Sequence, residues 1–211
     1  MQTDVPNAIR SQATVYLKRG WQCVPLRSRS KSPLRKDWPN LRITPEQIAN
    51  YFSPTDNVGV ILGEPSGWLV DVDLDCPEAI AMADHYLPPS PAVTGRPSAP
   101  RSHRWYIAVG AKTEKHTDPS DGSMIVELRS TGAQTVVGPS IHPLGELYET
   151  LSGEPAVVPA PMLAACVRAL AEASLPIEVS DLQRAGFDCE LLGFDSDELA
   201  KLLDPGIGQC R

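Results

Sequence analysis

The chain has 211 residues, enough for one buried core and a small further unit, and 42% of them are hydrophobic, as in a globular protein. No apolar run approaches the roughly 18 residues of a membrane span, and the N-terminus lacks the basic start and apolar centre of a signal peptide. The five cysteines are scattered and form no C-x-x-C pair, which argues against a zinc site or a disulfide framework and favours reduced thiols in a cytosol.

The net charge of −7 at first argues against a nucleic-acid partner, but the charges are unevenly distributed. Residues 18–42 hold eight Lys or Arg and one Asp, a net +7, so the rest of the chain carries −14. A basic patch on an acidic protein can bind phosphates locally. A solvated loop rich in Arg and Lys is the other interpretation of the same pattern.

Hydrophobic periodicity, capping residues and turn residues predict the elements in chain order. The predicted elements are a helix at 7–19, a strand at 21–26, a helix at 44–53, strands at 57–63 and 68–74, a helix at 76–87, and strands at 103–109, 124–130, 134–138 and 147–150. The helix at 44–53 carries the clearest start, because Thr44 is placed as its N-cap, Pro45 at its first position and Gln47 closes a capping box. The segment 87–100 has five prolines and is predicted as a loop.

Helices and strands alternate over the first 150 residues, which predicts an α/β or α+β core with a mixed central sheet and flanking helices. The character changes after that point, and helical patterns at 161–174 and about 179–203 carry no sharp motif. We expect a first domain at 1–153, a proline-rich linker at 154–161 and a helical C-terminal segment at 162–211.

The stretch GWLVDVDLD, residues 67–75, holds an unusual strand. Asp71 and Asp73 alternate with apolar residues, lie about 6.6 Å apart along a strand and point the same way. Two like charges 4 Å apart repel by about 4 kcal/mol at an effective dielectric constant near 20, so such a pair requires a countercharge. Ligands that are all oxygen suit a hard divalent ion, Mg²⁺ or Mn²⁺.

Other interpretations of this stretch differ in strength. A calcium loop is excluded, because Cys76 stands where that loop requires glycine and Met82 where it requires its bidentate glutamate. A purely structural role, in an exposed edge strand or at a helix start, remains open for a lone D-x-D motif. Asp75 is interpreted as a helix-leading acid, favoured by the helix dipole.

Two later strands carry further candidates. Glu127 interrupts the apolar strand MIVELRS and would complete a three-carboxylate site for two metal ions. Arg129, on the same face, would reach a phosphate or pair with Glu127, and a surface salt bridge is the plain alternative. His103 opens a strand directly after the proline-rich loop and can donate to phosphate oxygens, although a lone histidine is more often structural.

In this order the motifs K-x-P…W, NVGVILG, VDVD, a histidine before an apolar strand, and VELRSTG…VVGPSIHPLGELY resemble the bifunctional primase-polymerase domain. That family belongs to the archaeo-eukaryotic primase superfamily and occurs in replication proteins of phages and plasmids. The resemblance covers roughly residues 10–150. It implies a catalytic domain with the mixed sheet of that superfamily, followed by the helical appendage.

The resemblance also implies roles for single residues. Asp71 and Asp73 match the first acidic motif, which binds the catalytic metals. His103 matches the second motif, which contacts the phosphates of the incoming nucleotide. Glu127 matches the acid of the third motif, and the turn that contains Ser140 and His142 matches a hallmark expected to shape the pocket.

The second motif departs from the family pattern, since Arg101 stands where a small residue is usual. Ser102 is therefore expected to take over part of the nucleotide contacts. Together with His103, Arg129 and Lys31, it would cradle the triphosphate.

The expected activity is that of a DNA primase and DNA polymerase, a nucleotidyltransferase with two Mg²⁺ or Mn²⁺ ions, acting in phage or plasmid replication. Its expected partners are a DNA template and primer, held by residues 18–42, and (d)NTPs. No G-x-x-x-x-G-K-[ST] motif is present, so no P-loop helicase is expected within these residues. The resemblance implies a helicase domain downstream in a longer protein. We expect the cytoplasm of a bacterial or archaeal host cell and no membrane partner.

Three rival functions share some of these features. A nucleotide-sugar transferase also uses D-x-D with Mn²⁺, but it leaves the basic segment unexplained. A two-metal nuclease would use the same carboxylates on DNA. A catalytically inactive module that binds single-stranded DNA would need no metal.

Overall fold

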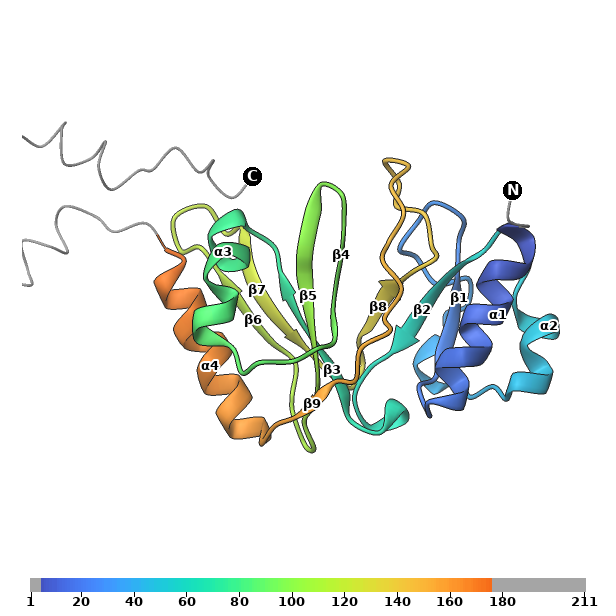
Figure 1. Ribbon diagram of the computed structural model, residues 1–211, viewed down its shortest axis with the longest axis horizontal. Coiled ribbons are helices and arrows are strands. Elements are labelled where there is room, and N and C mark those ends of the chain that lie inside the picture. Colours follow the sequence, from blue (N-terminus) through green and yellow to red (C-terminus); the bar gives the residue numbers. More distant parts are fainter. Residues whose placement is uncertain (1–4, 176–211) are drawn as a thin grey trace, which may run out of the picture.

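Two β-sheets with helices on their outer sides make up residues 5–175, the part of the chain that the computed structural model describes (Figure 1). The helices are α1 (Val5–Lys18), α2 (Ile48–Tyr51), α3 (Pro77–Tyr86) and α4 (Ala160–Ala173). The strands are β1 (Cys23–Leu26), β2 (Asn57–Ile61), β3 (Leu69–Leu74), β4 (Val93–Arg96), β5 (Ala99–Ile107), β6 (Glu114–Thr117), β7 (Met124–Arg129), β8 (Gln134–Val137) and β9 (Ala156–Val157). The α/β class with flanking helices is therefore confirmed.

The larger sheet has the strand order β4-β5-β3-β7-β6, and every neighbouring pair in that order is antiparallel. The short strand β9 adds a parallel pairing to β5, which makes the sheet mixed. β3 lies at the centre, and all six of its residues are buried. A central strand is thus the one that carries the paired aspartates.

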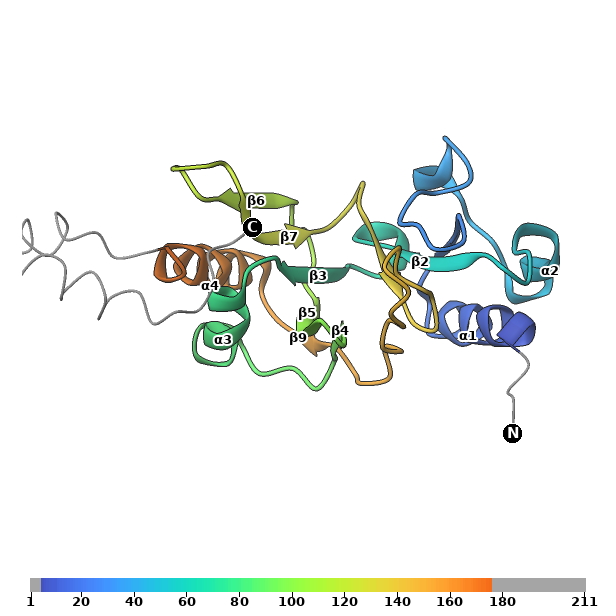
Figure 2. The same ribbon diagram turned by 90° about the horizontal axis from the view of Figure 1, so that it is seen from above.

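The two faces of the larger sheet differ in chemistry because side chains alternate along each strand. One face carries Val70, Val72 and Leu74, which pack in a core with α3 and α4. The helices α3 and α4 lie along that side of the sheet in both views (Figure 1, Figure 2). The opposite face carries Asp71 and Asp73 and is turned toward the smaller sheet.

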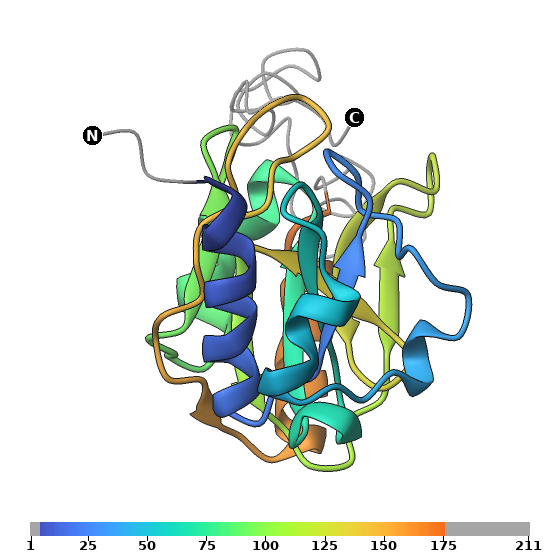
Figure 3. The same ribbon diagram turned by 90° about the vertical axis from the view of Figure 1, so that its right-hand side faces the viewer.

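The smaller sheet has the order β1-β2-β8 and is antiparallel throughout. Its core includes Tyr16 and Trp21 at one end and reaches Leu69 and Trp105 of the larger sheet. Figure 3 shows α1 and α2 in front of this sheet, on the side away from the larger one. The ribbons of the two sheets lie close together near the start of β3 and diverge toward its other end (Figure 1).

The predicted helix start at Thr44 is confirmed, since Gln47 Oε1 accepts a hydrogen bond of 3.0 Å from the Thr44 amide. A short 3₁₀ turn at Pro45–Gln47 leads there into α2. The predicted strand at 147–150 is wrong, because the β-pairing of that segment is an isolated bridge between Ile141 and Leu147 rather than a strand. The predicted loop at 87–100 contains β4, and the polar strand β6 was not predicted.

The helix α4, which we assigned to the C-terminal segment, packs into the same core as α3. Leu163, Val167 and Leu170 are fully buried there. The helix predicted at about 179–203 lies outside the described residues. The division of the chain into domains stays a prediction.

Candidate active site

The antiparallel register of three strands brings the candidate residues together. Asp73 of β3 lies directly opposite His103 of β5 and directly opposite Glu127 of β7. Asp71 lies opposite Arg129 of β7. Directly opposed residues share a face of the sheet, so all five side chains project toward the smaller sheet. We call Asp71, Asp73 and Glu127 the carboxylate cluster.

Asp71 is the most deeply placed of these side chains, with none of its surface exposed. Its Oδ2 accepts a 2.7 Å hydrogen bond from Oγ1 of Thr135, which lies on β8 of the smaller sheet. The same oxygen lies 3.0 Å from Nδ1 of His103. Both sheets therefore hold this carboxylate, and the Thr135 contact had no signal in the sequence because it joins residues 64 positions apart.

Asp73 and Glu127 share a guanidinium group between them. Nη2 of Arg129 lies 2.5 Å from Asp73 Oδ2, and its Nε donates to Glu127 Oε2 at 2.7 Å. Nζ of Lys115, on β6, lies 3.6 Å from Glu127 Oε1. The sequence did not identify Lys115 because the polar strand that carries it was not predicted.

The charges of the cluster set the protonation of its neighbours. Burial alone would lower the pKa of His103, but the carboxylates of Asp71 and Asp73 outweigh burial and raise it to about 9. The ring is therefore an imidazolium at neutral pH. Burial would also lower the pKa of the Arg129 guanidinium, but the negative charges of Asp73 and Asp71 outweigh burial and raise it. Loss of solvent and then the charge of Asp73 raise the pKa of Asp75 to about 6.

The carboxylate cluster fits a hard divalent cation by its donor chemistry, since three carboxylates from adjacent strands share one face. Their oxygens bind Arg129, His103 and Lys115 rather than facing one common point. Accordingly, within residues 5–175 no group of three or more His, Cys, Asp or Glu side chains is already arranged as a metal site.

The remaining predicted residues are placed differently. Ser102 is buried and alternates with His103 along β5, so it belongs to the face that α3 covers, away from Asp71. Lys31 lies in the loop after β1, and its carbonyl accepts a 3.0 Å hydrogen bond from Nε2 of Gln134, the neighbour of Thr135. The structure thus ties the loop of Lys31 to the strand that carries Thr135, and it places Ser102 away from the cluster.

A second group of polar side chains lies beside the cluster. His142 and Tyr148, in the segment after β8, pack edge to face with ring centroids 5.7 Å apart. Burial, then the positive charges of Arg96 and Lys31, lower the pKa of His142. The Tyr148 hydroxyl is buried and has no hydrogen-bond partner among the described residues. Tyr148 and Arg96 were not identified from the sequence as site residues.

The basic segment 18–42 divides into two parts. Arg19 is used internally, since it covers the ring of Trp21 at 3.8 Å and donates to the carbonyl of Gly153 at 2.8 Å. The exposed basic residues of the segment are Lys18, Arg27, Arg29, Lys31, Arg35, Lys36 and Arg42. Three of them, Arg27, Arg29 and Lys31, lie in the loop after β1, which Asn57 ties to the segment after β8.

Comparison with known proteins tests the family that the sequence suggested. Residues 13–163 match the family described as Bifunctional DNA primase/polymerase, N-terminal. Residues 173–209 match a second family, the ParB-methyltransferase HTH domain, and most of that match lies outside the described residues. No curated protein matches the chain.

In the part of the chain that the structure describes, no helix has the length and apolar character needed to cross a membrane. The family match spans both sheets, all the residues of the carboxylate cluster, His103 and Arg129. The family that the sequence resembles is therefore confirmed, and the chain belongs to the bifunctional DNA primase/polymerase family.

Proposed function

We propose that this chain carries out template-directed nucleotidyl transfer. The 3′-hydroxyl of a primer attacks the α-phosphorus of a (d)NTP, a phosphodiester bond forms, and pyrophosphate leaves. The observation that carries this proposal is the register that places Asp73 opposite both His103 and Glu127, with Asp71 on the same face. Family membership supports the same chemistry.

The carboxylate cluster would hold two Mg²⁺ or Mn²⁺ ions. Bound ions of this kind lower the pKa of an attacking hydroxyl and neutralise charge on the leaving pyrophosphate. The chain's own contribution is to keep the three carboxylates on one rigid face. Thr135 fixes the orientation of Asp71, and the side chains of Arg129 and His103 balance the negative charge.

His103 and Arg129 are the proposed contacts to the triphosphate. In the metal-free protein His103 is protonated at neutral pH, and a charged N–H donor forms strong hydrogen bonds with phosphate oxygens. Arg129 can do the same, because a guanidinium binds a phosphate in place of a carboxylate with the same fork of donors. Ser102 lies on the other face, and we leave it out of this cradle.

Lys31 and the other exposed basic residues are the proposed contacts to the template and primer backbone. Lys31, Arg27 and Arg29 share a loop that is tied to the strand of Thr135. Binding through such residues is independent of sequence and weakens as salt increases.

The C-terminal match suggests a further unit. We propose that residues 173–209 act as a unit of the family described as ParB-methyltransferase HTH domain. These residues include eight Asp or Glu and two Lys or Arg, a net −6, so repulsion by phosphates makes DNA an unfavourable partner for the segment as a whole. We further place the protein in phage or plasmid replication, in the cytoplasm of a bacterial or archaeal cell, with a helicase as partner.

The test is extension of a labelled primer on a template strand with dNTPs and Mn²⁺ or Mg²⁺. The wild type should lengthen the primer, and the double variant Asp71→Asn/Asp73→Asn should not. Glu114→Gln is the matched control, because Glu114 is a carboxylate of the same sheet that lies opposite Leu128, on the other face. It should retain extension.

Other outcomes select among the rivals. Primer shortening that the double variant abolishes would identify a nuclease. Metal-independent DNA binding without any change in primer length would identify an inactive binding module. Either result would overturn the proposed transfer reaction.

A further inference from the structure

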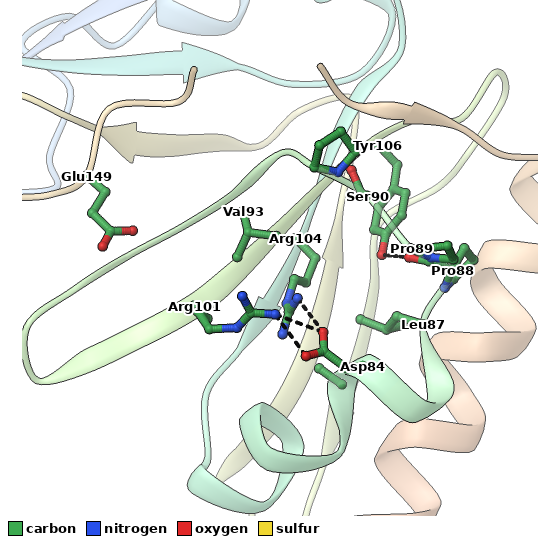
Figure 4. A pocket seen from close by; sticks show the side chains of 12 residues that line it. Asp84, Leu87, Pro88, Pro89, Ser90, Val93, Arg101, Arg104, Tyr106 and Glu149 are labelled. Atoms are coloured by element: carbon green, nitrogen blue, oxygen red, sulfur yellow. Dashed lines mark hydrogen bonds and ion pairs between the residues drawn. The ribbon is translucent and has the colours of Figure 1, made fainter. Parts of the chain in front are cut away.

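A pocket of about 550 Å³ lies behind β5, on the face opposite the carboxylate cluster (Figure 4). It is enclosed by β5, the end of α3 and the proline-rich segment that leads to β4. Its volume is in the range of sites for small molecules. No residue of the proposed nucleotidyl-transfer site lines it.

Two arginines share one carboxylate at one end of this pocket. Nη1 of Arg104 donates to Asp84 Oδ1 at 2.7 Å, and Nη2 of Arg101 lies 2.8 Å from Asp84 Oδ2. Figure 4 shows the three side chains converging, while Glu149 lies apart from them on the far side of the pocket. This end therefore holds two positive charges against one negative charge.

The two guanidinium groups carry more N–H donors than the carboxylate of Asp84 can accept from. Arg104 is only 5% exposed, and its Nε is buried without a hydrogen-bond partner among the described residues. Buried donors without partners are rare in native proteins, so the arginines at this end of the pocket have donor capacity that Asp84 does not use. Asp84, by contrast, has 68% of its side chain exposed, so it can turn away without losing a buried position.

The backbone at Arg101 is arranged for this contact. Arg101 has a φ of 58°, a left-handed conformation that is unfavourable for a residue with a long side chain. Alternation along β5 would place Arg101 on the face of His103, yet its guanidinium reaches Asp84 of α3 beside Arg104. Strained residues of this kind concentrate at binding sites. Arg101 is also the position at which the sequence departs from the family pattern.

Most of the other lining residues are apolar, and Ser90 and Glu149 are the remaining polar ones. Leu87, Pro88, Pro89 and Val93 line it together with Tyr106, whose hydroxyl donates to the carbonyl of Pro88 at 2.7 Å. Such a wall suits a flat apolar group, and the hydroxyl of Tyr106 is already satisfied. The site thus combines an anion-binding end with an apolar wall.

We propose that this pocket binds a free mononucleotide, a phosphate monoester that carries a flat heterocycle, with its phosphate on Arg101 and Arg104 in place of Asp84. A planar guanidinium binds phosphate and carboxylate in the same bidentate way, so a dianionic phosphate can replace the exposed carboxylate. The site is separate from the transfer reaction and does not depend on it.

The test is calorimetric titration of the full chain at low salt with EDTA, which prevents metal-dependent binding at the carboxylate cluster. The probes are deoxyadenosine 5′-monophosphate, deoxyadenosine and inorganic phosphate. The monophosphate should bind at least about tenfold more tightly than either of the others, because only it uses both the arginines and the apolar wall. Equal binding of the monophosphate and deoxyadenosine would overturn the proposal, as would the absence of binding.

Three variants separate a binding role from a structural one. Arg101→Gln should weaken binding of the monophosphate about tenfold or more. Arg168→Gln is the matched control, because the side chain of Arg168 is 59% exposed, against 55% for Arg101, and also pairs with a carboxylate, that of Glu114. This variant should bind the monophosphate as tightly as the wild type does.

The decisive variant is Asp84→Asn. Removing the competing carboxylate should tighten binding several-fold, whereas a merely structural ion pair predicts no gain. Unchanged or weaker binding by Asp84→Asn in a folded protein would overturn the exchange of carboxylate for phosphate.

Discussion

At the scale of single residues, the charges on the inner face of the larger sheet balance one another. Asp71 and Asp73 face His103, and Asp73 and Glu127 face Arg129. His103 and Arg129 each contact two carboxylates, so removing either cation affects two anions at once. The residues of this face are therefore expected to respond strongly to pH and to added cations.

The stability of the folded protein should depend on pH through His103. Its pKa is raised from 6.5 to about 9 in the folded protein, so its stabilising effect is fully present below pH 6.5 and is lost as the pH rises through 9. We expect the stability difference between the wild type and His103→Gln to be up to about 3 kcal/mol at pH 6 and to fall steadily toward pH 9.5. Urea denaturation across this range measures the difference. A difference that is constant with pH would contradict the charge pairing.

The effect of Mn²⁺ on the melting temperature should depend on Arg129. In Arg129→Gln, Asp73 and Glu127 face each other across adjacent strands without the cation between them, and their repulsion should lower the melting temperature. Added Mn²⁺ should then raise the melting temperature of the variant more than that of the wild type, because the ion replaces the lost charge. Thermal melting with and without Mn²⁺ checks this. Equal shifts in the two proteins would show that Mn²⁺ binds elsewhere.

At the scale of elements, the turn between β2 and β3 sets where the aspartates lie. Gly63 has a φ of 76°, its amide donates to the Leu69 carbonyl at 2.7 Å, and a Cβ there would lie 2.3 Å from the backbone nitrogen of Thr131. Only glycine meets both conditions. The turn therefore depends on the segment after β7 as well as on its own backbone conformation.

Two glycines separate these conditions. Gly110→Ala, with a φ of 79° and nothing within 4 Å of the new Cβ, should destabilise the protein by about 1 kcal/mol through strain alone. Gly63→Ala should cost at least about 2 kcal/mol more, because the backbone of Thr131 must move and because the φ of 76° and ψ of −143° at Gly63 are a combination that other residues rarely adopt. Chemical denaturation of the two variants compares them. Equal losses would show that the contact with Thr131 relaxes freely.

At the scale of the whole molecule, one side chain joins the two sheets at their diverging end. Glu146, in the segment after β8, accepts a 2.9 Å hydrogen bond from the Ser98 amide in the turn between β4 and β5, and its Oε2 lies 2.6 Å from Nη1 of Arg96. Gly95 and Glu149 add a backbone hydrogen bond of 3.0 Å between the same two segments. These contacts hold the β4–β5 hairpin, which leads to His103, against the segment that follows β8 of the smaller sheet.

We expect Glu146→Gln to loosen this hairpin without unfolding the sheet. Hydrogen exchange at the Ser98 amide should become faster, while exchange in β3 should stay slow. Glu154→Gln is the control, because Glu154 is 85% exposed and pairs with Arg19, an arginine outside the hairpin. Unchanged exchange at Ser98 would show that the backbone contacts alone hold the hairpin.

The sequence by itself determined the local features. Alternation predicted that Asp71 and Asp73 share one face of a strand, and β3 confirms both the strand and its buried apolar side. The order of motifs also determined the family, which the comparison confirms. These features depend on neighbours in the chain, so periodicity, capping and motif order contain the information.

Only the tertiary structure decided which strands lie beside β3 and in which register. The pairings of Asp73 with His103 and Glu127 join residues 30 and 54 positions apart, and a shift of one residue would turn each side chain to the other face. The same holds for Thr135, for Lys115 on an unpredicted polar strand, and for Arg101, whose left-handed backbone takes it to the opposite face. Contacts between distant segments depend on packing of the whole fold, and no local pattern encodes them.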